Sequence, residues 1–124
     1  MIILYLKEDF GMLNKEAQRN LQLIKQMIIQ IWGEDCELLN IDIKDSPYSE
    51  FELLIRLYHK VEAGIYYDRS ALDIGIKQNE KYILLGNLTN KPVVRGIKAM
   101  DPKNLRSNFL ILNEVAQAIV ENYK

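Results

Sequence analysis

The sequence predicts a single α/β (α+β) domain that spans residues 1–124, with helices packed on a mixed β-sheet. Three observations predict this fold class. A length of 124 residues fits one hydrophobic core, and three prolines with six glycines give no sign of a long linker. Short apolar runs of strand length are interspersed with longer stretches whose apolar residues recur every three or four positions. The expected element order is β-α-β-α-β-β-β-α.

The N-terminal third predicts a strand–helix–strand unit. Residues 2–6, IILYL, form a continuous apolar run that suits a strand buried on both faces. A helical apolar stripe follows and ends at Gly33, a residue that commonly stops helices. Residues 36–43, CELLNIDI, predict a second strand, which a right-handed crossover would place parallel to the first. The stripe consists of Leu13, Ala17, Leu21, Ile24, Ile28 and Ile31.

Residues 45–60 predict a second helix, because they open with residues that start helices. Asp45 or Ser46 can cap the first turn, and Pro47 fits its first position. The glutamates at positions 50 and 52 would complement the positive end of the helix dipole. The buried face of this helix would consist of Phe51, Leu54, Ile55 and Tyr58.

Residues 64–86 predict an antiparallel meander of three strands. In residues 72–77, LDIGIK, apolar and polar or small residues alternate with the period of a half-exposed strand. The short polar segments DRSA and QNEK are typical of tight turns between strands. The YDRS motif at residues 67–70 is therefore interpreted as a turn and not as a catalytic site.

The C-terminal part predicts a last helix. Asp101 followed by Pro102 is a second cap-then-proline start, and the helix would run nearly to the end of the chain. A sixth short strand is predicted around Val93, Val94 and Ile97. The stripe of the last helix consists of Leu105, Phe109, Leu112, Ala116, Ile119 and Tyr123.

Composition excludes several classes of protein. Cys36 is the only cysteine, so neither an internal disulfide nor a cysteine-based metal site is possible. No apolar run reaches the roughly 20 residues that cross a bilayer, and the N-terminus lacks the pattern of a secretory signal. We expect a cytoplasmic protein with no membrane partner, no metal and no cofactor.

Catalytic signals are weak. His59 is the only histidine, and its plainer interpretation is an exposed or hydrogen-bonded residue at an element end. Neither Ser70 nor Cys36 has an evident base that would make it a nucleophile. No glycine-rich phosphate loop is present.

Nucleic acid is not expected as a partner. Several tyrosines could stack on bases, but nucleic-acid binders usually add a strongly basic surface. Here 16 basic residues stand against 17 acidic ones, which gives a net charge of −1. The tyrosines are better explained as core and sheet residues.

Negative charge is concentrated between residues 34 and 52. Lys44 is the only basic residue of this segment, so its net charge is −6. Part of this charge could serve helix-dipole compensation and solubility; the alternative is a surface that binds a basic protein, with Tyr48 and Phe51 as aromatic anchors. The acidic residues are Glu34, Asp35, Glu37, Asp42, Asp45, Glu50 and Glu52.

The chain resembles the small immunity proteins of bacterial polymorphic-toxin and contact-dependent growth inhibition systems. The resemblance covers the whole chain: its size, its α/β build, the acidic segment, and the tyrosine-rich IYYDRSALDIGI hairpin followed by the helix LRSNFLILNEVAQAIVENYK. It implies binding to a cognate toxin domain, often a nuclease, whose active site or substrate groove is then occluded. No functional residue can be transferred by motif.

Two alternatives remain open. The first is a small hydrolase or metal-dependent nuclease that uses Asp42, Asp68 or Asp73, because Asp42 and Lys44 share one side of a strand and Asp68 and Asp73 flank a tight turn. The second is a self-associating structural domain whose interface is the stripe of the last helix.

Overall fold

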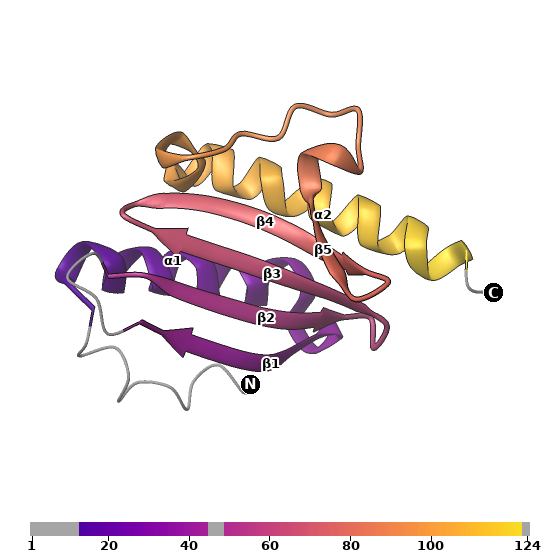
Figure 1. Cartoon of the computed structure of the whole chain (residues 1–124), viewed down its shortest axis with the longest axis horizontal. Coiled ribbons are helices and arrows are strands. Elements are labelled where there is room, and N and C mark those ends of the chain that lie inside the picture. Colours follow the sequence, from indigo (N-terminus) through magenta and orange to yellow (C-terminus); the bar gives the residue numbers. More distant parts are fainter. Residues whose placement is uncertain (1–12, 45–48, 123–124) are drawn as a thin grey trace.

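The computed structural model describes residues 13–44 and 49–122, which form one antiparallel sheet with two long helices on the same face (Figure 1). In Figure 1 the sheet lies in front and both helices lie behind it. The predicted α+β class is therefore confirmed. Among the described residues no helix is long and apolar enough to cross a membrane.

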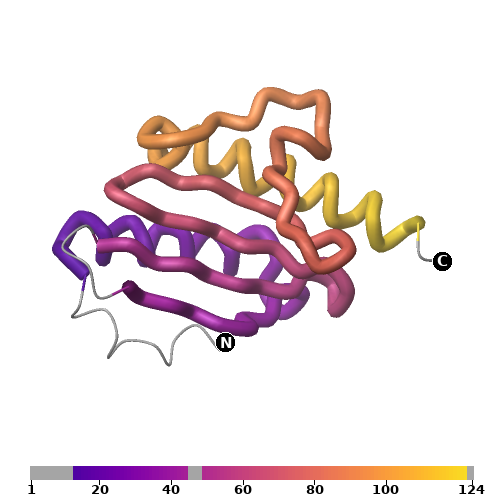
Figure 2. The backbone as a smooth tube through the Cα atoms, in the orientation of Figure 1, coloured from indigo at the N-terminus to yellow at the C-terminus, as the bar shows by residue number. Residues whose placement is uncertain are grey.

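The sheet is a five-stranded meander in which each strand pairs with the next in the sequence (Figure 2). All four pairings are antiparallel, so the described strands form no mixed sheet. Antiparallel neighbours need only short hairpins, which agrees with the brief polar segments between the strands. The strands are β1 (Cys36–Ile43), β2 (Phe51–Leu57), β3 (Val61–Asp68), β4 (Ala71–Gln78) and β5 (Lys81–Leu84).

The predicted meander of residues 64–86 is confirmed, and the YDRS motif ends in a hairpin turn. Arg69 and Ser70 connect β3 to β4, and both have positive φ, 53° and 69°. Asn79 and Glu80 connect β4 to β5 in the same way. Two consecutive left-handed residues match the right-handed twist of the strands they join.

The second predicted helix is wrong, because most of its described residues form β2 and the turn after it. Along β2 the residues alternate strictly between buried and half-buried, as they do in a strand with one face on the core. Phe51 and Ile55 are buried, as expected for the helix, but Leu54 points to the other face. The proposed cap residues Asp45, Ser46 and Pro47 lie outside the described residues.

The predicted parallel unit is only partly described. Residues 2–6 lie outside the described part, so the structure does not address the first strand. The second predicted strand matches β1 residue for residue, and its described pairing is antiparallel to β2.

Helix α1 (Lys15–Trp32) begins and ends with specific contacts. The Asn14 side chain caps it by accepting a hydrogen bond from the Ala17 N–H at 2.8 Å. Gly33 ends it with a φ of 54°, and its N–H donates to the Ile29 carbonyl. The predicted stop at Gly33 is therefore confirmed.

Helix α2 (Pro102–Asn122) confirms the predicted last helix. The Asp101 carboxylate accepts from the Lys103 N–H at 3.2 Å, as an N-cap does. The predicted sixth strand is wrong: Val93 and Val94 belong to no strand, and Ile97 begins the short helix η4 (Ile97–Met100) with 70% of its surface exposed.

The core lies between the sheet and the helices. Trp32 at the end of α1 packs on Phe109 of α2 with ring centroids 5.7 Å apart. The Trp32 indole N–H also donates to Asn113 Oδ1 at 2.8 Å, and the Tyr58 hydroxyl donates to the same oxygen. One amide oxygen thus joins α1, α2 and the turn between β2 and β3.

Candidate functional site

The sheet has one face that neither described helix covers, which we call the open face (Figure 1). Its members follow from the two-residue alternation of burial along each strand and from the strand register. The open face consists of Glu37, Asn40 and Asp42 on β1, Glu52, Leu54 and Arg56 on β2, Glu62, Gly64, Tyr66 and Asp68 on β3, Asp73, Gly75 and Lys77 on β4, and Tyr82 and Leu84 on β5.

Charge on the open face is mixed, with a small negative excess. Six carboxylates share this face with Arg56 and Lys77, and Lys44, Arg69 and Arg95 reach three of these carboxylates from its periphery. The negative excess is therefore concentrated at the carboxylates that no described cation contacts. The carboxylates are Glu37, Asp42, Glu52, Glu62, Asp68 and Asp73.

Four of these six carboxylates form an ion pair. Asp42 lies 2.7 Å from the Lys44 ammonium, Asp73 lies 2.9 Å from Arg95, and Asp68 lies 3.4 Å from Arg69. Glu37 contacts Arg56 and His59, as described below. All these pairs are exposed to water, so each adds little to stability.

Glu52 and Glu62 differ from the other four. Within the described residues, neither side chain forms an ion pair or a hydrogen bond. Glu52 lies directly opposite Asp42 in the β1–β2 register, and Glu62 lies opposite Arg56 in the β2–β3 register. The Arg56 guanidinium, however, contacts Glu37 at 3.7 Å. These two glutamates hold charge that no described cation contacts.

Two glycines shape the centre of the open face. Gly64 on β3 pairs with Leu54 on one side and with Gly75 of β4 on the other, and Gly75 in turn pairs with Leu84. The Tyr66 ring lies over Gly64, so close that a Cβ there would meet the ring Cζ at 2.6 Å. Only glycine leaves room for the ring at this point.

Tyr66 and Tyr82 form an aromatic pair above these glycines. Their ring centroids are 6.3 Å apart and the rings are perpendicular, an edge-to-face arrangement. Tyr82 is 38% exposed and Tyr66 is half-buried, so both rings stay accessible from solvent. Sequence analysis treated both tyrosines as part of the core or the sheet and assigned them no role.

The environment raises the pKa of both phenols. Loss of hydration raises the pKa of Tyr66 to about 12, with smaller contributions from Tyr82 and from the negative charge of Glu52. The pKa of Tyr82 is also raised, first by loss of hydration and then by Glu62, while Lys77 opposes the shift. Both rings are therefore neutral at physiological pH and lie within the electrostatic field of the two unpaired glutamates.

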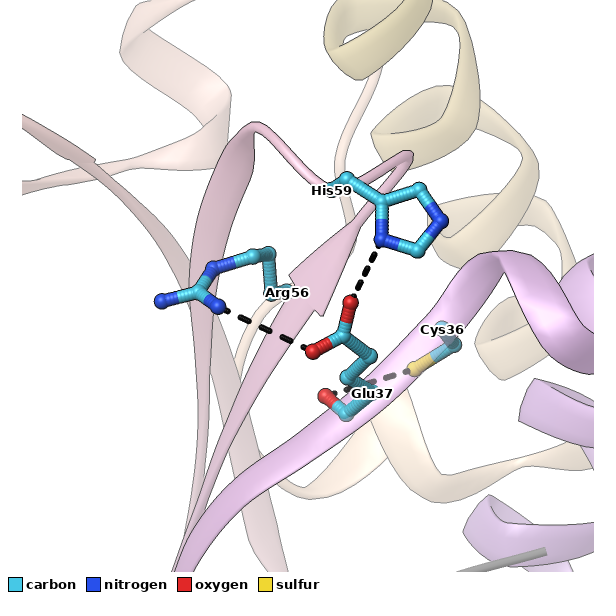
Figure 3. A network of polar contacts seen from close by, with 4 residues as sticks. All are labelled: Cys36, Glu37, Arg56 and His59. Atoms are coloured by element: carbon cyan, nitrogen blue, oxygen red, sulfur yellow. Dashed lines mark hydrogen bonds and ion pairs between the residues drawn. The ribbon is translucent and has the colours of Figure 1, made fainter.

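A polar cluster lies on the β1–β2 side of the same face, beside Glu62 in the strand register (Figure 3). The Glu37 carboxylate extends between Arg56 and His59, at 3.7 Å from Arg56 Nη1 and 2.7 Å from His59 Nδ1. His59 follows the end of β2 in the turn to β3, and its side chain is 74% exposed. This arrangement agrees with the plainer interpretation of His59 as a hydrogen-bonded residue at an element end.

The predicted acidic segment does not form one cluster. Glu34 and Asp35 lie in the short helix η2 (Gly33–Asp35), next to Glu37 at the start of β1. Glu52 lies at the opposite end of the β1–β2 pair, four residues along β2 from Arg56, the partner of Glu37, or about 13 Å at 3.3 Å per residue, and Glu50 precedes it. The helical turn that was expected to gather them is a strand.

The predicted patch also included Asp45, Tyr48 and the proposed anchor Phe51. Asp45 and Tyr48 lie outside the described residues. Phe51, expected as an exposed anchor, is 1% exposed and stacks on Tyr67 in the core with ring centroids 4.5 Å apart. It is therefore a core residue and not an interface anchor.

The carboxylates of the enzyme alternative do not converge. Asp42 is on β1, whereas Asp68 and Asp73 are on β3 and β4 and are paired with arginines. No group of three or more potential metal ligands occurs among residues 13–44 and 49–122. These observations test neither the expectation that the protein is not an enzyme nor the enzyme alternative, and both stay predictions.

The stripe expected to serve self-association is used inside the domain. Leu105, Phe109, Leu112 and Ala116 are fully buried in the core cluster. The outer side of α2 carries one large exposed apolar residue, Leu110, at 42%. This distribution favours a helix that packs on its own sheet.

Glu62, Tyr66 and Tyr82 are the candidate residues that sequence analysis missed. A partial signal was FELLIRL, in which Glu52 and Arg56 fall on one face of a strand and Phe51, Leu53, Ile55 and Leu57 on the other, although its apolar residues also fit a helical stripe. Compared with known proteins, the chain matches no family model, no curated protein and no solved structure.

Proposed function

We propose that this protein binds a basic protein through the open face and inhibits it by covering its functional surface. The observation that carries the proposal is the composition of that face: six carboxylates surround a centre of leucine, glycine and tyrosine. A partly apolar centre with aromatic rings and a charged periphery is the usual composition of a protein interface.

The size and rigidity of the face support this proposal. Five strands about 4.8 Å apart and up to eight residues long span roughly 600 Å², against the roughly 800 Å² that each partner contributes to a standard interface. Backbone hydrogen bonds on both sides hold the central strands, so little backbone entropy is lost on binding.

Glu52 and Glu62 are the carboxylates at which a basic partner is expected to bind. A cation that meets them does not have to displace a described internal partner, whereas at Asp73 or Asp42 it competes with Arg95 or Lys44. Complementary charge speeds association and excludes acidic partners. It also opposes the binding of nucleic acid, whose phosphates the face would repel.

The more specific proposal is that the protein acts in the cytoplasm as an immunity protein for a toxin domain. Toxins that cleave nucleic acid need a positively charged groove to hold phosphates, and an acidic sheet face is complementary to such a groove. Inhibition then needs no catalytic group on this chain, because occupation of the groove excludes the substrate. The resemblance of the chain to immunity proteins supports this version.

Charge reversal on the open face tests the proposal. The variant Glu52→Lys/Glu62→Lys should lose protection when it is co-expressed with the toxin domain encoded beside this protein, and the wild type should restore growth. A control, Glu114→Lys/Glu121→Lys, makes the same charge change on α2, breaks only the exposed ion pair between Glu114 and Lys91, and should protect normally. Full protection by the first variant, or a neighbouring gene that encodes no toxic domain, contradicts the proposal.

A further inference from the structure

We infer that Tyr66 and Tyr82, together with Glu52 and Glu62, form a receptor for an arginine side chain of the partner. This inference rests on the proposed function and deepens it, because it names the chemical group that the centre of the open face recognises. Four features of the described residues carry it: the fixed position of the Tyr66 ring, the exposure of the pair, the unpaired charge, and the direction of the neighbouring cations.

The Tyr66 ring is held in place before any partner arrives. Its tip rests over Gly64, and its Cε2 atom would lie 3.6 Å from a Cβ at Gly75. Tyr82 meets it edge to face, which limits rotation from the β5 side. A ring already fixed in this way loses little conformational entropy when a planar cation stacks on it.

The position of the ring places it between the two unpaired carboxylates. Glu52 lies directly across from Tyr66 on β2, and Glu62 precedes Tyr66 by four residues on the same face of β3. Because the ring leans back over Gly64, its tip lies midway between Glu62 and the Tyr66 backbone along the strand. A cation over the ring is therefore within the attraction of a carboxylate at each end.

The internal cations near this point are directed elsewhere. Arg56 faces Glu62 in the register, but its guanidinium contacts Glu37. Lys77, which faces Tyr82, extends to Glu80 at 3.8 Å. The charge of Lys77 still acts on Tyr82, whose pKa it lowers, but within the described part of the chain no cation forms an ion pair with Glu52 or Glu62.

The combination of an aromatic pair with two nearby carboxylates favours arginine over lysine as the bound side chain. A guanidinium is planar, stacks on aromatic rings and can donate two parallel hydrogen bonds to one carboxylate. It also carries a weaker hydration shell than an ammonium, so a partly apolar site with two leucines costs it less. Lysine would gain the charge attraction but little of the stacking.

Two peptides of equal charge test the inference: octa-arginine and octa-lysine, titrated into the isotope-labelled full chain at physiological salt. We expect octa-arginine to bind at least fivefold more tightly and to shift the ring signals of Tyr66 and Tyr82. The variant Glu52→Gln/Glu62→Gln should lose most of this binding, whereas Glu114→Gln/Glu121→Gln, with the same loss of charge on α2, should keep it.

The aromatic part of the receptor needs its own variant. Tyr66→Leu should lower octa-arginine affinity to that of octa-lysine and leave octa-lysine binding unchanged, whereas Tyr66→Phe should behave as the wild type. The glutamine pair keeps both rings, so it tests the inference even if Tyr66→Leu is poorly folded.

Failure of the inference is distinguishable from failure of the proposed function. If the two peptides bind with equal affinity, and the binding of both is lost in Glu52→Lys/Glu62→Lys, the arginine receptor is wrong. The open face is then a general acidic docking surface. Peptide shifts that map away from the open face overturn the receptor as well. The proposed function is then decided separately by the growth-protection experiment.

Discussion

The Asn108 side chain on α2 forms hydrogen bonds with both backbone polar groups of Val94. Its Nδ2 donates to the Val94 carbonyl at 2.8 Å, and its Oδ1 accepts from the Val94 N–H at 3.0 Å. Asn108 is only 1% exposed. A buried side chain thus takes the place of a neighbouring strand and holds the segment after β5 against the helix without strand pairing at Val94.

Replacing Asn108 should destabilise the domain. Asn108→Ala removes both hydrogen bonds and leaves two Val94 backbone groups without a partner, which costs about 2–3 kcal/mol of unfolding free energy. Urea unfolding followed by circular dichroism measures it. Asn104→Ala, one helical turn earlier, removes a single exposed bond to the Lys98 carbonyl and should cost less than about 1 kcal/mol. Equal losses in the two variants would contradict this prediction.

Cys36 should be unreactive in the folded protein. Burial, and to a lesser degree the charge of Glu37, raises the pKa of its thiol from 9.0 to about 12. At pH 8 only about one molecule in ten thousand then carries the reactive thiolate. We expect negligible alkylation by iodoacetamide at that pH and rapid alkylation in urea, followed by mass spectrometry. Fast labelling without denaturant would mean that β1 opens at its start or that the thiol is less buried.

Gly64→Ala should displace the Tyr66 ring and lower its pKa. The new methyl group would lie 2.6 Å from Cζ of that ring, so the ring has to swing away from the sheet toward water. Renewed hydration then moves the Tyr66 pKa from about 12 toward the ordinary value of 10. Ultraviolet titration of the phenolate measures it, with Tyr66→Phe to identify the signal. Gly86→Ala, whose nearest neighbour would be Val93 at 3.9 Å, should leave the titration unchanged.

The same substitution should alter the pH dependence of stability. The folded chain holds the Tyr66 proton up to a pKa of about 12, whereas the unfolded chain releases it near 10. This contribution to stability is therefore complete below pH 10 and is lost as the pH rises toward 12. In Gly64→Ala the loss between these pH values should be smaller, and an identical pH profile in both proteins would count against the assignment.

The strand β2, where a helix was predicted, explains why part of the fold could not be predicted from the sequence. In FELLIRL the apolar residues fit a helical stripe through Phe51, Leu54 and Ile55 as well as a strand stripe through Phe51, Leu53 and Ile55. Helix-start residues upstream favoured the helix. Pairing with β1 on one side and β3 on the other decides for the strand, and such long-range contacts leave no local signal.

The candidate site follows from the same pairing. Glu52 and Glu62 are ten residues apart, and only the β2–β3 register places them on one face, with the tip of the Tyr66 ring between them over Gly64. The acidic residues of η2, of β1 and around the start of β2 were visible in the sequence as a charge concentration. Because β2 is an extended strand and not a helix, these residues lie at two ends of the β1–β2 pair, which the sequence did not indicate. The sequence shows where the charged residues are, but predicting which of them share one face of the sheet requires the strand register.

Glu52→Gln should make the protein more stable. Glu52 lies directly opposite Asp42 in the β1–β2 pair, and like charges in that position repel each other by a few tenths of a kcal/mol. Lys44 neutralises Asp42 only in part, because their ion pair is exposed, and its attraction to Glu52 offsets part of the repulsion. We expect the unfolding free energy to rise by about 0.3–0.8 kcal/mol at low salt and the gain to shrink as added salt screens the repulsion. Urea unfolding at two salt concentrations measures both effects.

The control for this prediction is Glu52→Gln in an Asp42→Asn background, where the opposing charge is absent and the substitution should bring no gain in stability. A residue whose removal stabilises the fold is retained for another reason, and binding is the reason that the open face suggests. If Glu52→Gln both stabilises the domain and weakens its binding to octa-arginine, the Glu52 carboxylate lowers the stability of the fold and contributes to binding. If it destabilises the domain instead, Glu52 has a structural role, and the unpaired charge on which the binding argument depends does not exist.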